Sequence, residues 1–199
     1  MKRWLISWLV VSCFLVTGCG CLLDWLGCVE CESFSFEADV QDWQADGTDL
    51  GDPPIEWSVE RSQELASDGT SSVKLWLNNL NDAGKIWIER AFAVEPDRRY
   101  RVRVEYAFAS AAFGSVNLWR IIAGVAATSP ETADDLTFQG DAGNGADSDV
   151  GYRWLQKRYT FDVESGPDGL LHVFIGVWGT WENARTHYVD DVRVCITPR

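Results

Sequence analysis

The chain has 199 residues, of which 46% are hydrophobic and 13% aromatic. This composition is sufficient for one domain with a packed core. The formal net charge of −13 at pH 7 argues against a nucleic-acid partner, because phosphates attract basic surfaces. It equally argues against attachment to an anionic membrane by charge.

The N-terminus has the pattern of a secretory signal. Lys2 and Arg3 precede an apolar run over residues 4–16, and small residues follow it. The run is short for a hydrocarbon core of about 30 Å, and Ser7 and Ser12 interrupt it. We therefore expect export and cleavage rather than a membrane span.

The end of this segment, residues 16–19 (VTGC), resembles a bacterial lipobox, with Val16 in the place of the usual Leu. The resemblance implies a signal peptide over residues 1–18 and a lipid on Cys19. It also implies an extracytoplasmic, lipid-anchored protein, and Gly20 after the cysteine implies delivery to the outer membrane. The alternatives are a secreted protein cut nearby and an uncleaved anchor.

A short tether over residues 19–32 precedes the expected domain at residues 33–199. Apart from the lipidated cysteine, the mature chain keeps Cys21, Cys28, Cys31 and Cys195. An even number of cysteines in an oxidising compartment indicates disulfides. A metal or redox pair at residues 28–31 is the alternative, but it lacks a second pair at metal-site spacing, and four cysteines allow three pairings.

The rest of the chain alternates polar and apolar residues over short runs, which is typical of half-buried β-strands. The runs cover residues 33–37, 72–77, 85–88, 100–108, 159–163, 171–177 and 192–194. Turn clusters separate them at residues 46–49, 51–54, 67–70, 81–84, 95–97 and 166–169. About nine strands, with at most one helical turn within residues 129–135, predict an all-β protein with two antiparallel sheets in a sandwich.

The longest irregular stretch runs over residues 124–151, with a short strand expected near residues 136–139. Its second part, residues 140–149, is rich in glycine and carboxylates. A solvated loop accounts for this composition. A calcium loop is the alternative, because hard cations bind several oxygens on a tightly turning backbone.

Three motifs occur in the order found in jelly-roll carbohydrate-binding modules and galactose-binding-like sandwiches. They are Phe36-Glu37 followed by Trp43, the turn and strand of residues 67–75, and the closing strand of residues 188–194. The chain resembles these families over residues 34–196. The resemblance implies a jelly-roll fold and the binding of carbohydrate.

The same resemblance implies a structural calcium ion between the first strand, the 67–70 turn and the last strand. Glu37, Asp190 and Asp191 are then the candidate ligands, together with backbone oxygens near residues 68–71. Carboxylates that converge without a cation repel one another. The alternative is that Asp190 and Asp191 only cap the strand edge.

The disulfide pairing also follows from the resemblance. The first and last strands of such a fold run side by side, with Cys31 just before one and Cys195 at the end of the other. We therefore expect a Cys31–Cys195 disulfide, and Cys21–Cys28 as a second pair.

The alternation also assigns the tryptophans to strand faces. Four of them lie on the side that carries polar and charged residues: Trp76, Trp87, Trp154 and Trp178. An aromatic ring beside such groups can stack on a sugar while they bind its hydroxyls. The alternative is that loops cover the rings. Trp181, with Arg185 nearby, forms a second candidate site, whereas Trp43 and Trp57 are expected in the core.

No catalytic constellation stands out in the sequence. The two histidines, His172 and His187, have no nucleophile motif beside them, and 30 acidic residues give no identifiable glycosidase pair. We expect a non-catalytic, carbohydrate-binding envelope lipoprotein. The alternative is a structural or adhesive lipoprotein that binds another protein through tryptophan-rich patches.

Overall fold

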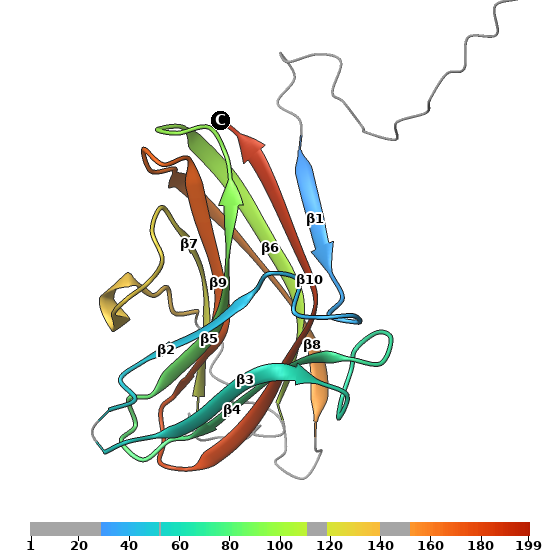
Figure 1. The fold of residues 1–199 in the computed structure, drawn as a ribbon, viewed down its shortest axis with the longest axis vertical. Helices are drawn as coiled ribbons and strands as arrows, with labels where there is room; N and C mark the ends of the chain where they lie inside the picture. Colours follow the sequence, from blue (N-terminus) through green and yellow to red (C-terminus); the bar gives the residue numbers. More distant parts are fainter. Residues whose placement is uncertain (1–28, 52, 111–118, 140–151) are drawn as a thin grey trace, which may run out of the picture.

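Two antiparallel β-sheets lie face to face in the computed structural model, which describes residues 29–51, 53–110, 119–139 and 152–199 (Figure 1). Sheet A contains β1 (Glu30–Phe34), β3 (Glu56–Ser62), β4 (Ser72–Asn78), β6 (Arg99–Ser110), β8 (Arg153–Glu164) and β10 (Ala184–Pro198). Sheet B contains β2 (Gln44–Thr48), β5 (Lys85–Ala93), β7 (Trp119–Ala126) and β9 (Leu170–Gly179). The predicted all-β, two-sheet architecture is confirmed.

The strands of each sheet are not in chain order. Sheet A runs β3-β4-β10-β6-β8, with β1 also paired to β10, and sheet B runs β2-β5-β9-β7. A 3₁₀ turn at Ala133–Asp135 matches the helical turn expected in this region. Within the described residues, no helical segment has the length and hydropathy of a membrane span.

The core lies between the sheets and is built from alternate residues. In β4 and β9 the inward side chains are at most 2% exposed: Val73, Leu75, Leu77, Leu171, Val173, Ile175 and Val177. The rings of Phe34, Trp43 and Phe92 meet edge to face beside this cluster. The core position expected for Trp57 is wrong, because its edge strand leaves it 36% exposed.

Three strands depart from the alternation that marks the others. β2 lies where residues 46–49 suggested a turn, and it pairs only with β5 at the sheet edge. β3 is another edge strand. β7 is apolar on both sides, since the segment after it covers its outer face. These three strands therefore escape the period-two pattern, whereas β8, also at an edge, keeps it.

The first and last strands are neighbours, as the resemblance implied. β1 pairs antiparallel with β10, and Cys31 lies directly opposite Cys195. The expected disulfide joins these two residues. The strand begins at Glu30, so part of the expected tether belongs to sheet A. Residues 1–28, with the signal peptide, Cys19 and the Cys21–Cys28 pair, and the glycine-rich loop of residues 140–149, lie outside the described residues.

A β-bulge interrupts the pairing of β10 with β6. Asp190 faces Ala107 and Arg193 faces Glu105, so two residues of β10 oppose Tyr106 alone. The bulge residue Asp191 has a positive φ of 49°. The extra residue shifts the alternation by one, so Val192 remains in the core while Arg193 is exposed.

Candidate functional site

The outer face of sheet A, opposite the core, carries aromatic side chains from three strands. Residues directly paired on neighbouring strands point to the same side. One such row consists of Trp154 (β8), Ala109 (β6), Tyr188 (β10) and Lys74 (β4). Trp76 lies two residues beyond Lys74, on the same face. The sheet thereby brings together Trp76 and Trp154, two of the predicted tryptophans.

These rings differ in exposure but share a polar surround. Trp76 and Trp154 are half-buried, while Tyr152, just before β8, is 42% exposed. The ring of Tyr152 meets that of Tyr188 edge to face, with centroids 5.3 Å apart. Between Trp154 and Tyr188, β6 contributes only the methyl group of Ala109. Ala109 is 0% and Tyr188 4% exposed, so the accessible rings of this face are those of Trp76, Trp154 and Tyr152.

Hydrogen bonds fix the tyrosine at the centre of this row. The Tyr188 hydroxyl donates to Glu64 at 2.9 Å, and the Lys74 ammonium donates to the same carboxylate at 2.7 Å. Burial and the Glu64 hydrogen bond raise the pKa of Tyr188, so it remains a neutral donor. The hydrogen bond from Lys74 lowers the pKa of Glu64. Tyr188 is 4% exposed and packs against Tyr152, so it supports the exposed ring and does not itself stack on a ligand.

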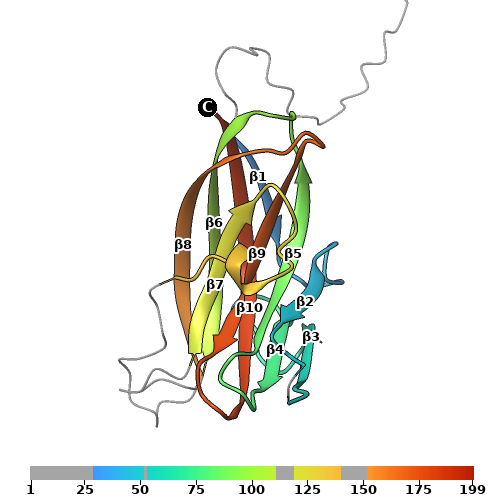
Figure 2. The same ribbon diagram turned by 90° about the vertical axis from the view of Figure 1, so that its left-hand side faces the viewer.

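Trp87 and Trp178 lie on the outer face of the other sheet. Residues 127–139 fold back over this face, in yellow in front of β7 and β9 in Figure 2. The Ala123 amide donates to Thr137 at 3.1 Å, and the Gln139 amide donates to Ile121 at 3.0 Å. These bonds hold the segment along β7.

This cover buries Trp87 and leaves Trp178 half-buried. Trp87 is 0% exposed and packs with Ile122, Leu136 and Phe174. The Trp178 ring lies 5.2 Å from that of Phe138, and its N–H donates to the Asp82 carbonyl at 2.9 Å. The structure thus gives Trp87 no open surface, in contrast to the sequence expectation. The four predicted tryptophans do not form one platform.

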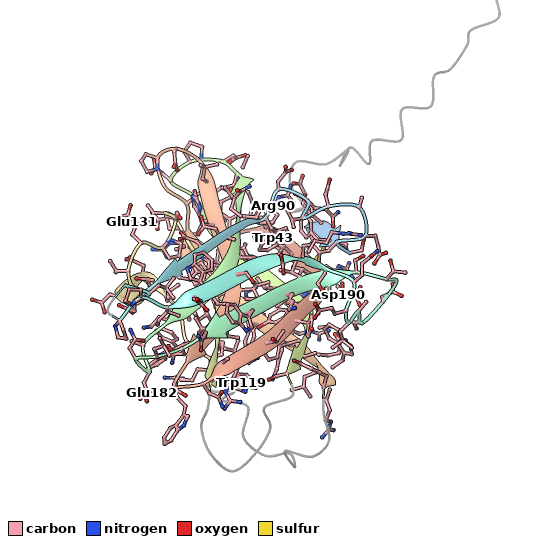
Figure 3. All side chains as sticks on the ribbon, turned by 60° about the horizontal axis from the view of Figure 1, so that its bottom comes forward. Trp43, Arg90, Trp119, Glu131, Glu182 and Asp190 are labelled. Atoms are coloured by element: carbon pink, nitrogen blue, oxygen red, sulfur yellow. A yellow bond between two sulfur atoms is a disulfide. The ribbon has the colours of Figure 1, made fainter. Side chains whose placement is uncertain are left out.

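The second predicted site, Trp181 with Arg185, lies where β9 passes into β10. Trp181 is 54% exposed, and the Asn79 amide anchors its carbonyl at 3.2 Å. Arg185 is half-buried, and desolvation lowers its pKa. Trp119 and Glu182 mark this end of the molecule in Figure 3.

His187 is enclosed in the core at the same end. It is 2% exposed and lies against the rings of Phe108 and Trp119. Burial lowers the pKa of His187 to about 3, so it is neutral at physiological pH. The other histidine, His172, has its Nδ1 3.7 Å from the carboxylate of Glu89, to which the Ser129 hydroxyl donates.

The predicted calcium ligands gather at the turn between β3 and β4. Glu37 accepts hydrogen bonds from the Thr70 amide at 2.9 Å and the Ser71 amide at 3.0 Å. Asp190, labelled in Figure 3, accepts one from the Ser67 amide at 2.7 Å. The first strand, the turn and the last strand therefore meet as the resemblance implied.

The carboxylates at this turn bind amides instead of facing a common centre. The Thr70 amide lowers the pKa of Glu37, whereas burial raises that of Asp190. Gly69 has φ +64°, and any Cβ there would collide with the Glu37 carboxylate. Among the residues described, no three His, Cys, Asp or Glu side chains are grouped to hold a metal ion. Calcium stays a prediction.

A groove of about 470 Å³ opens beside the bulge on the outer face of sheet A. Charged and polar side chains line it: Glu105, Gln156, Lys157, Arg158, Asp191 and Arg193. Sequence analysis missed this groove. The alternation of β8 gave the side of Gln156 and Arg158, but nothing signalled the bulge that brings Arg193 beside them.

No protein-family model and no curated protein matches the chain. Among solved structures, it is similar to a carbohydrate-binding module of the β-sandwich superfamily (TM-score 0.48, 18% identity), covering 80% of this chain and 59% of that one. It is also similar to the CBM22-1 xylan-binding domain of Paenibacillus barcinonensis Xyn10C (TM-score 0.45, 15% identity), covering 87% of this chain and 97% of that one. A third similar structure is the K1 cleaved adhesin domain of Lys-gingipain from Porphyromonas gingivalis W83 (TM-score 0.48, 13% identity), covering 83% of this chain and 97% of that one. The functional argument therefore rests on this chain's own side chains.

Proposed function

We propose that the protein is a non-catalytic carbohydrate-binding lipoprotein whose ligand lies across the outer face of sheet A. The observation that carries the proposal is that the half-buried Trp76 and Trp154 lie on the same outer face of sheet A. Aromatic rings stack on the C–H faces of sugars, and neighbouring polar groups bind the hydroxyls. Lys74, Glu64 and Gln156 supply such groups here.

The length of the row favours a glycan chain over a single sugar. Trp76 stands on β4 and Trp154 on β8, with β10 and β6 between them. Three strand spacings of about 4.8 Å, with an offset of two residues along the strand, separate the two tryptophans by roughly 16 Å. A ligand that touches both rings must therefore be an oligosaccharide or longer.

The anchor belongs to the proposal as well. Lipidation of Cys19 would hold the N-terminal side of the domain at the membrane. β1 begins opposite Ile196 near the end of β10, whereas Tyr188 lies eight residues earlier on β10. At about 3.3 Å per residue this places the aromatic row roughly 26 Å along the strand from the anchored end. The face is thereby held clear of the membrane surface.

The histidines support a non-catalytic role. His187 is buried and neutral. The Ser129 hydroxyl donates to the Glu89 carboxylate and not to His172, so this serine is not poised as a nucleophile.

Calorimetry of the protein against a panel of soluble polysaccharides tests the proposal. We expect Trp76→Ala and Trp154→Ala each to weaken binding about fivefold, since one stacking ring contributes roughly 1 kcal/mol. Trp57→Ala is the matched control, because Trp57 is also partly exposed but lies on the other side of β3. If the folded wild-type protein binds no polysaccharide, the carbohydrate function is overturned and adhesion to another protein takes its place.

A further inference from the structure

The groove beside the bulge is distinguished by its arginines. Arg158 contacts the Glu105 carboxylate at 2.5 Å, and Arg103 reaches the other oxygen of the same carboxylate at 3.6 Å. Arg193 lies directly opposite Glu105 in the register. Glu105 thus pairs with two guanidinium groups, while Arg193 beside it has no acidic partner within 4.0 Å among the described residues.

This local charge runs against the composition of the chain. The whole sequence has 17 basic and 30 acidic residues. The groove is lined by three basic residues, Lys157, Arg158 and Arg193, and two acidic ones, Glu105 and Asp191. An excess of positive charge on an acidic protein attracts anions specifically to that place.

The groove continues the aromatic row. Trp154, Gln156 and Arg158 are alternate residues of β8 on the outer face, and they lie opposite Ala109, Ala107 and Glu105 of β6. Alternate residues of a strand stand about 6.6–6.8 Å apart. A chain stacked on Trp154 and extended along β8 therefore passes Gln156 and reaches Arg158 and Arg193.

The bulge makes this arrangement possible. Without the extra residue, Arg193 would point inward and Val192 outward, because strand side chains alternate. The bulge keeps Val192 in the core and turns Arg193 to the groove. Asp191, whose positive φ forms the bulge, lines the same groove.

We propose that this groove binds the oxyanion of an acidic polysaccharide, a carboxylate or sulfate borne by a sugar further along the chain from the one stacked on Trp154. The proposal rests on the proposed carbohydrate function and names the substrate class. The planar guanidinium fork pairs with either oxyanion through two parallel hydrogen bonds. The ligand oxyanion supplies the acidic partner that Arg193 lacks. Arg158 is 73% exposed, so its solvated pair with Glu105 is weak and leaves it free to turn to the ligand.

The test compares matched charged and neutral ligands by calorimetry on the full, detergent-solubilised protein. One pair is oligogalacturonate and its methyl ester, and the other is a sulfated galactan and its desulfated form. We expect one charged member to bind about tenfold tighter than its neutral partner, as expected for a charge-assisted hydrogen bond. Raising salt from 0.05 to 0.5 M should remove most of that advantage, because it shortens the screening length.

The variants are Arg158→Gln and Arg193→Gln, with Arg99→Gln as the matched control. Arg99 is an exposed arginine of sheet A that pairs with Glu164 outside the groove. Each groove variant should bring charged ligands to the affinity of neutral ones and leave neutral binding unchanged, while the control keeps the wild-type preference. Unchanged melting temperatures exclude unfolding as the cause.

The outcomes separate this proposal from the previous one. Equal affinity for charged and neutral ligands, with binding lost only in the tryptophan variants, would overturn the oxyanion site and keep the carbohydrate function. Charged binding that depends on the arginines but not on Trp76 or Trp154 would keep the groove and overturn the platform. Absence of any glycan binding would overturn both.

Discussion

The two outer faces of the sandwich begin alike in sequence and end differently in structure. Each has two tryptophans among polar residues: Trp76 and Trp154 on sheet A, Trp87 and Trp178 on sheet B. Sheet A leaves both of its tryptophans half-buried, whereas on sheet B residues 127–139 bury Trp87 completely and leave Trp178 half-buried. Amphipathic alternation thus identifies a side of a strand, but a covering segment decides whether that side is a core or a surface.

The largest effect that we expect concerns the bond that fastens β1 to sheet A. The Cys31–Cys195 disulfide spans a sequence separation of 164 residues. In the chain-entropy model, a loop of that length stabilises the fold by about 5 kcal/mol. Cys31→Ser with Cys195→Ser should lower the free energy of unfolding by about that amount in urea denaturation. A loss under about 1 kcal/mol would show that strand pairing alone holds β1.

Removing a covered ring should cost nearly as much. Trp87→Ala opens a cavity beneath residues 127–139, and truncation of a buried aromatic side chain typically costs about 3–5 kcal/mol. Trp154→Ala, on the open face, should cost less than about half of that. Urea denaturation of both variants measures the difference. Equal losses would mean that the two faces are covered to the same extent.

Calcium is the next effect in size. If Glu37, Asp190 and Asp191 bind calcium, the ion at 100 times its dissociation constant stabilises the protein by about 2.7 kcal/mol. Chelator should then lower the melting temperature of the wild type but not of Asp190→Ala. A melting temperature indifferent to chelator would leave these carboxylates as caps of the β3–β4 turn.

The smallest effect concerns pH. Burial raises the pKa of Asp190 in the folded protein, so the folded state binds a proton more tightly than the unfolded state. Stability is therefore lost as pH rises from the unfolded value near 4 through the raised folded value. Asp190→Asn does not titrate, and its stability should fall less over that window. Denaturation curves of both proteins at a series of pH values in metal-free buffer measure this difference. A steeper fall in the stability of the variant would contradict a raised pKa of Asp190.

Much of this fold could be predicted because most strands have one buried face. Alternation located β4, β5, β6, β8, β9 and part of β10, and it assigned the sides of β4, β5, β8 and β9 correctly. β2, β3 and β7 were missed, since β2 and β3 show no regular alternation of burial and β7 is apolar on both sides.

The site was harder to predict than the fold. The covering of Trp87 depends on backbone bonds between residues 127–139 and β7, which no local pattern encodes. The place of Arg193 depends on one extra residue in β10. Both features depend on pairing between segments that are distant in the sequence, so local sequence patterns do not predict them.

The most direct test of the account is glycan binding by paired tryptophan variants, measured by calorimetry against the best polysaccharide of the panel. Trp76→Ala combined with Trp154→Ala should weaken binding about 30-fold, from two stacking rings of roughly 1 kcal/mol each. Trp178→Ala, on the covered face, should stay within about twofold of the wild type. A loss of binding in Trp178→Ala that the double variant does not show would contradict the assignment of the site to sheet A.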